Sequence, residues 1–179
     1  ALAWFDLEHI SKGPSRLDMA KLGSLNAHYI KNIDEEILFQ HLKALISNKY
    51  EINDESERYI KQALSLIKTR VKLLNELADL AIIFIIPDII EISAEAQRVI
   101  NDTKTEFMRA LREFIASIDV FTAENIQVQL KEFAAMKSLK LGELMMPIRA
   151  MVTGKTSSPS IFNIMAILGK DNILRRLYG

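Results

Sequence analysis

The hydrophobic positions of this chain recur with the period of an amphipathic helix. Segment 19–31 carries one apolar stripe, on Leu22, Leu25, Tyr29 and Ile30, and segment 35–47 carries another, on Ile37, Leu38, Leu42, Leu45 and Ile46. Spacings of three and four residues place such side chains on one face of a helix. No segment of useful length shows the strict alternation of a half-buried strand. The pattern therefore predicts an all-α chain.

Residues suited to helix capping stand before most of the periodic segments. Their side-chain oxygens can accept hydrogen bonds from the first free amides of a helix. The candidates are Asp18, Asp34, Asn53, Ser93 and Thr122. They predict helices over residues 19–31, 35–47, 54–68, 94–117 and 123–138, and a further helix is expected over roughly 71–86, before Pro87.

The C-terminal segment has the clearest boundary signals. Ser158 followed by Pro159 is typical of an N-cap with proline in the first helical position, and an apolar run follows. Gly169 is expected to end that helix in the left-handed conformation. A short last helix is expected over 172–178, and a joint between two helical groups is expected near 87–93.

Composition excludes several classes of protein. Cysteine is absent, so neither a disulfide framework nor a zinc–thiolate site is possible. The most apolar run, residues 80–86, is far shorter than the about 20 residues that cross a bilayer. The N-terminus lacks the features of a signal peptide. It begins without Met, and we expect a fragment of a longer chain.

The net charge is zero, but the charges are segregated along the chain. Residues 34–57 hold seven acids and two bases, residues 58–75 hold five bases and no acid, and residues 131–179 hold eight bases and three acids. Clustered bases can form a nucleic-acid surface. The same segregation also fits solvated helix faces, and it leaves the two interpretations open.

The sequence carries no complete catalytic or nucleotide-binding motif. Gly154-Lys155-Thr156 ends like a phosphate-binding loop, but Arg149 stands where that loop needs a second glycine, and no strand-like run precedes it. The three histidines are too scattered for a triad or a metal site. We expect no catalytic residue and no metal site in this chain.

Two separated segments resemble bacterial glutamyl-tRNA synthetases. "LDMAKLGSLNAHYIK" (17–31), preceded by "FDLEHIS", is similar to the family's D-x-x-K-L-x-x-L/M-N-x-x-Y-I segment. "KLGELMMPIRAMVTGKTSSPSIFNIMAILGKDNILRRL" (140–177) resembles the family's C-terminal signature, in which K-L-G, P-L-R-x-A-L-T-G, a proline and L-L-G-K follow in order. "LIKTRVKLLNEL" and "ISAEAQRVI" fall between them in the family's order, so the resemblance spans nearly the whole chain.

The resemblance implies a tRNA-binding portion of a larger enzyme. The family joins glutamate to its tRNA with ATP and magnesium, in a catalytic domain whose HIGH-type motif does not occur here. It implies the end of a stem-contact region over 1–33 and two helical anticodon-binding subdomains over 34–92 and 93–179. The implied partner is tRNA(Glu), with no DNA and no membrane. We expect a cytoplasmic, monomeric protein whose isolated fragment binds no cofactor and catalyses nothing.

The resemblance also implies the residues of the anticodon site. Arg149 corresponds to the Arg of the P-L-R motif. Ser158, Pro159 and Ile161 correspond to the residues that accompany it at the first two anticodon bases. Arg70 corresponds to the helix position that faces the third base. Lys155 is expected to contact a phosphate.

Arg70 gives the sharpest expectation, because a guanidinium suits the acceptors of cytosine and opposes the donors of guanine. We therefore expect discrimination between glutamate and glutamine anticodons. Alternatives remain open at this stage. Arg149 and Ser158 can serve helix capping alone, and the whole chain can be a helical protein–protein interaction module without an RNA ligand.

Overall fold

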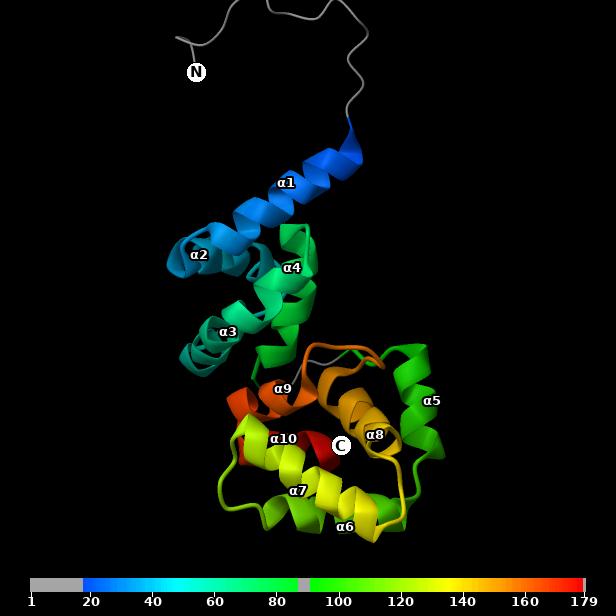
Figure 1. Ribbon diagram of the computed structural model, residues 1–179. Coiled ribbons are helices and arrows are strands. Elements are labelled where there is room, and N and C mark those ends of the chain that lie inside the picture. Colours follow the sequence, from blue (N-terminus) through cyan, green and yellow to red (C-terminus); the bar gives the residue numbers. More distant parts are fainter. Residues whose placement is uncertain (1–17, 87–90, 179) are drawn as a thin grey trace, which may run out of the picture.

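The regular elements of the described residues are all helical. A computed structural model describes residues 18–86 and 91–178 of the chain, and Figure 1 shows its helices in sequence order. The helices are α1 (Met19–Asn32), α2 (Glu35–Ile46), α3 (Asp54–Ile67), η3 (Lys68–Arg70), α4 (Leu74–Ala81), η4 (Ile82–Phe84), α5 (Ala94–Asp102), α6 (Thr105–Ala116), α7 (Ala123–Met136), α8 (Leu141–Thr153), α9 (Ile161–Leu168) and α10 (Lys170–Tyr178). The all-α prediction is confirmed. Residues 1–17, residues 87–90 at the centre of the expected joint, and residue 179 lie outside the described residues.

The five predicted capping residues all cap helices. Asp18, Asp34, Asn53, Ser93 and Thr122 each accept a hydrogen bond from an amide in the first turn of the helix that follows. These bonds satisfy donors that have no partner inside the helix. The local signals therefore located five helix starts correctly.

The helix predicted over 94–117 is wrong, because the segment forms two helices. α5 ends at Asp102 and α6 begins at Thr105, with Thr103 and Lys104 in extended conformations between them. The Thr103 hydroxyl donates to the carbonyl of Val99 at 2.6 Å. This local bond ends α5, because it offers that carbonyl an alternative to the helical ladder.

The helix predicted over roughly 71–86 begins later than expected. The Glu76 carboxylate accepts from the amides of Lys72 and Leu73 at 2.7 and 3.1 Å, so α4 starts after Leu73. A tighter 3₁₀ turn, η4, then follows Ala81.

The helix α8 was not predicted at all. It carries Pro147 in its interior, where proline removes a hydrogen bond and disfavours a helix. Pro147 is buried, as are Leu144, Ile148 and Val152 on the same helix. Burial of this apolar face outweighs the local cost of the proline.

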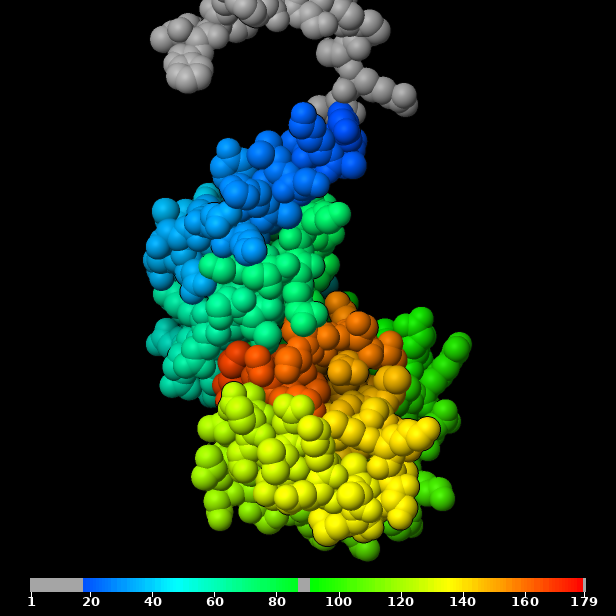
Figure 2. Space-filling model, viewed as in Figure 1, coloured from blue at the N-terminus to red at the C-terminus, as the bar shows by residue number. Residues whose placement is uncertain are grey.

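The helices form two groups that share one apolar core. Figure 1 shows α1–α4 above and α5–α10 below, and Figure 2 shows the surfaces of the two groups in contact. One connected cluster of buried side chains runs from Ile30 in α1 to Leu177 in α10. The helices α3 and α9 pack directly on one another. The proposed division at residues 92/93 stays a prediction.

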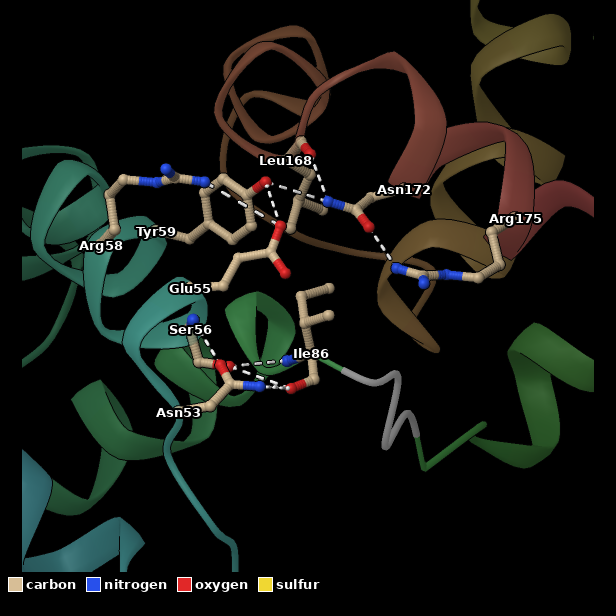
Figure 3. Close-up of polar contacts among 9 residues, drawn as sticks. All are labelled: Asn53, Glu55, Ser56, Arg58, Tyr59, Ile86, Leu168, Asn172 and Arg175. Atoms are coloured by element: carbon tan, nitrogen blue, oxygen red, sulfur yellow. Dashed lines mark hydrogen bonds and ion pairs between the residues drawn. The ribbon is translucent and has the colours of Figure 1, made fainter.

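Polar contacts also join the two groups (Figure 3). The Asn172 side-chain amide donates to the Tyr59 hydroxyl at 3.0 Å, and that hydroxyl donates to Glu55 at 2.9 Å. Below them in the figure, the Ile86 amide donates to the Ser56 hydroxyl at 2.8 Å. The Ile86 carbonyl accepts from the Asn53 side-chain amide at 2.7 Å. These directional bonds help to hold α3 against α10 and against the end of the first group.

Candidate nucleic-acid interface

Most bases of the segment 58–75 are engaged in ion pairs within the first helical group. Lys61 pairs with Glu36 and Glu57 at 2.9 Å each, and Lys68 pairs with Glu35 at 2.8 Å. Arg58 lies 3.9 Å from Glu55. The charge segregation seen in the sequence therefore serves, in large part, to join α2 and α3. It is weaker support for an RNA surface than the sequence suggested.

Arg70 is different from these bases. It is exposed at the end of η3, and no hydrogen bond or ion pair joins its side chain to the described residues. Its neighbours Ile67 and Val71 are buried, with exposed fractions of 0% and 6%. They anchor the backbone on both sides, so the guanidinium stands on a fixed turn and its donors are available to a ligand.

A shallow hollow of about 500 Å³ opens beside this guanidinium. We call it the Arg70 hollow, and its lining residues are Arg70, Val71, Lys72, Glu76, Asp79 and Leu80. Val71 and Leu80 supply apolar surface, and the other four supply charge. Its size lies within the range of about 300–1,000 Å³ that is typical of small-ligand sites. A planar base with a polar edge fits such a lining.

Arg149 and Ser158 are brought together, as the resemblance implied. The Arg149 Nε donates to the Ser158 hydroxyl at 3.1 Å, and both residues are half-buried. The Ser158 hydroxyl donates in turn to the Pro159 carbonyl at 2.9 Å. No described residue accepts from the terminal nitrogens of Arg149, so two NH₂ groups remain available on a side chain whose orientation is set.

The prediction that Ser158 caps the penultimate helix is wrong. α9 begins at Ile161, and its cap is Ser160, whose hydroxyl accepts from the Asn163 amide. The Ser158 hydroxyl is not free, because Arg149 and the Pro159 carbonyl already engage it. Serines stand on both sides of Pro159, and either can serve as an N-cap. The sequence alone does not decide between Ser158 and Ser160.

The other three residues predicted for the anticodon site differ in their solvent exposure. Lys155 is exposed, whereas Pro159 is buried and Ile161 is only 2% exposed. Ile161 is therefore almost wholly shielded from a ligand, whereas the Lys155 side chain is accessible.

The segment that resembled a phosphate-binding loop follows a helix and does not begin one. Gly154 ends α8 in the left-handed conformation, with φ 69° and ψ 5°, and its amide donates to the Ala150 carbonyl at 2.9 Å. A helix C-terminus presents carbonyl oxygens and partial negative charge, which repel phosphate. This geometry agrees with the rejection of the nucleotide site.

A second, smaller hollow connects the two helical groups. We call it the Lys155 hollow, with a volume of about 100 Å³, lined by Lys49, Tyr50, Asp79, Ile82, Ile83, Glu91, Thr153 and Lys155. Asp79 lines both hollows, so one face of α4 leads from Arg70 towards Lys155. Arg149 lines neither of them. Sequence reasoning missed Asp79, although its spacing of three residues from Glu76 already placed both on one helical face.

One of the two acids that line the Lys155 hollow, Glu91, is already paired. Glu91 accepts from Lys49 at 2.7 Å and from the Tyr50 hydroxyl at 3.1 Å. The hydrogen bond from Lys49, with that from Tyr50, lowers the pKa of Glu91 below its usual value, and Lys155 adds attraction. Lys155 itself forms no ion pair with a described residue, so its ammonium remains available.

The described residues contain no group of three or more carboxylate or histidine side chains placed to hold a metal ion. Within residues 18–86 and 91–178, no helix is long and apolar enough to span a membrane.

Residues 31–178 match the family described as the anticodon binding domain. The match covers most of the chain and all of the helices from α2 to α10. The chain therefore belongs to the anticodon binding domain family.

Among proteins with an anticodon binding domain, the chain is similar to glutamate–tRNA ligases. The chain is 40% identical over 99% of its length to glutamate–tRNA ligase 2 of Rickettsia akari, and it covers 38% of that protein. A structure of a glutamate tRNA ligase from Elizabethkingia meningosepticum, in complex with its amino acid, matches 97% of the chain with a TM-score of 0.77 and 25% identity. A glutamate-tRNA synthetase structure from Elizabethkingia anophelis matches 97% with a TM-score of 0.73 and 26% identity.

The similarity is thus to the anticodon-binding portion of glutamyl-tRNA synthetases, as the sequence resemblance predicted. The chain spans 34% of each matched structure and 38% of the curated relative.

Proposed function

We propose that this chain recognises a tRNA anticodon as part of a glutamate–tRNA ligase, which attaches glutamate to tRNA(Glu) with ATP and magnesium. The observation that carries the proposal is the unpaired Arg70 beside a base-sized hollow, in a chain of the anticodon binding domain family. The catalytic chemistry belongs to parts of the ligase other than this chain. We expect the protein to act in the cytoplasm as a monomer, without DNA or membrane partners.

The first two anticodon bases are assigned to the surface around Arg149. The Ser158 hydroxyl holds Nε, and the terminal nitrogens can donate to base carbonyls or stack on a base plane. Pro159 and Ile161, both buried at the start of α9, support this surface. Lys155, exposed in the preceding loop, is assigned a backbone phosphate.

The third anticodon base is assigned to the Arg70 hollow. A guanidinium there donates to the O2 and N3 acceptors of cytosine, whereas guanine turns donors towards it. Leaving those donors unpaired costs about 1–3 kcal/mol. The hollow therefore favours a glutamate anticodon ending in C over a glutamine anticodon ending in G.

Binding of anticodon stem-loops to the chain tests this proposal. We expect Arg70→Ala to weaken binding of the stem-loop ending in C by about 1.5–3 kcal/mol, or roughly 10- to 150-fold, and to reduce the preference over G. Fluorescence anisotropy measures both. Arg109→Ala is a matched control, since Arg109 is an exposed arginine on α6 with no hydrogen bond or ion pair to the described residues.

Salt dependence separates this function from a protein–protein interaction module. Contacts to single-stranded phosphates give a slope of about −0.7 per contact in a plot of log affinity against log salt. Absence of stem-loop binding at low salt, or equal binding of C and G by the unsubstituted chain, would contradict anticodon recognition.

A further inference from the structure

Asp79 is a carboxylate on the proposed RNA surface that has no structural task. It is exposed on α4, and no hydrogen bond or ion pair joins it to the described residues. The neighbouring acids are engaged, because Glu76 caps α4 and Glu91 pairs with Lys49. An unpaired carboxylate repels a polyanion, so its place between two hollows lined by cations is costly for RNA binding unless it contacts a base.

Asp79 shares the Arg70 hollow with Arg70. The hollow therefore holds a group that only donates hydrogen bonds and a group that only accepts them, beside the apolar surface of Val71 and Leu80. A base lying on that apolar surface turns its edge to both groups.

We propose that Asp79 is a specificity-determining residue, which accepts a hydrogen bond from the amino group of cytosine at the third anticodon position. This inference rests on the assignment of that base to the Arg70 hollow. Cytosine presents two adjacent acceptors, O2 and N3, followed by one donor, N4–H₂. Arg70 matches the two acceptors, and Asp79 matches the donor.

The carboxylate adds to the discrimination by the guanidinium, to which uracil presents an N3–H donor in place of the N3 acceptor of cytosine. Uracil carries the O4 acceptor where cytosine carries its amino group, and guanine carries O6 there. Either oxygen facing Asp79 sets two acceptors against each other and leaves both without a partner. Asp79 thus explains how the Arg70 hollow separates C from U, two bases of nearly the same shape.

The test compares Asp79→Asn with the unsubstituted chain on stem-loops that differ only in the third base. The asparagine amide keeps the size of the side chain but can turn either an oxygen or an NH₂ to the base. We expect the unsubstituted chain to bind C at least about fivefold more tightly than U. We expect Asp79→Asn to lower that ratio, while the part of the preference that Arg70 supplies, for C over both U and G, remains because Arg70 is intact.

Glu132→Gln is the matched control, because Glu132 is an exposed acid on α7 with no hydrogen bond or ion pair to a described residue. It removes the same charge and should leave the C/U ratio unchanged. An unchanged C/U ratio in Asp79→Asn, or an equal change in Glu132→Gln, overturns the role of Asp79 alone. Failure of the unsubstituted chain to prefer C over G overturns the proposed function as well, so the two failures are distinguishable.

Discussion

The same substitution, glycine to alanine, should have opposite effects at two positions of this chain. Gly169 links α9 to α10 with φ 79° and ψ 161°. Gly142 is the second residue of α8, with helical backbone. An added Cβ meets no atom within 4 Å at either position. Steric contact is therefore equal in the two variants, and only the backbone conformation differs.

The backbone conformation at each glycine sets the expected change in the free energy of unfolding. The region near φ 79° and ψ 161° is open almost only to glycine, and a side chain there costs about 1–3 kcal/mol. We expect Gly169→Ala to lower the free energy of unfolding by this amount, and the thermal midpoint by roughly 2–12 °C. Gly142→Ala should raise the free energy of unfolding by about 0.4–1 kcal/mol, because alanine loses less backbone freedom on folding.

Urea unfolding followed by far-ultraviolet circular dichroism measures both free energies. The two variants serve as each other's control, since each adds one methyl group in open space. If Gly169→Ala unfolds at the same urea concentration as the unsubstituted chain, or if both variants shift in the same direction, the backbone argument is refuted.

Two further predictions concern stability. Ser56→Ala leaves the buried Ile86 amide without an acceptor, whereas the Ile86 carbonyl keeps its bond from Asn53, so we expect a loss of about 1–3 kcal/mol in urea unfolding. Hydrogen bonds from Lys43 and Lys61 lower the pKa of Glu57, so its stabilisation is present above the ordinary glutamate pKa of about 4.3 and is lost as the pH falls through the lower folded value. Acid titration of Lys61→Met should show a smaller loss of stability over that range, and an unchanged titration would contradict this account.

The junction between the helical groups matters for function because the proposed site is divided between them. Arg70 belongs to the first group and Arg149 to the second. Asp79, on α4, lines both the Arg70 hollow and the Lys155 hollow. The bond from Asn172 to Tyr59 therefore helps to set the distance between the two parts of the proposed site.

Local signals in the sequence determined five helix starts and the class of fold. A capping side chain acts on amides two or three residues away, so Asp18 or Thr122 can be recognised without any knowledge of distant residues. The positive φ of Gly169 was also predicted, although its ψ is extended and not left-handed. The family resemblance followed from motifs in the sequence itself.

Only the tertiary structure decided the features that depend on distant partners. Helix α8 forms despite Pro147, because its apolar face is buried by other helices. Lys61 and Lys68 form ion pairs with acids of α2, whereas Arg70 forms no ion pair with any acid in residues 18–86 and 91–178. The acids of α2 that pair with Lys61 and Lys68 lie more than 20 residues away in the chain, and only folding brings them close. Charge along the sequence is therefore a poor guide to which cation remains free to bind RNA.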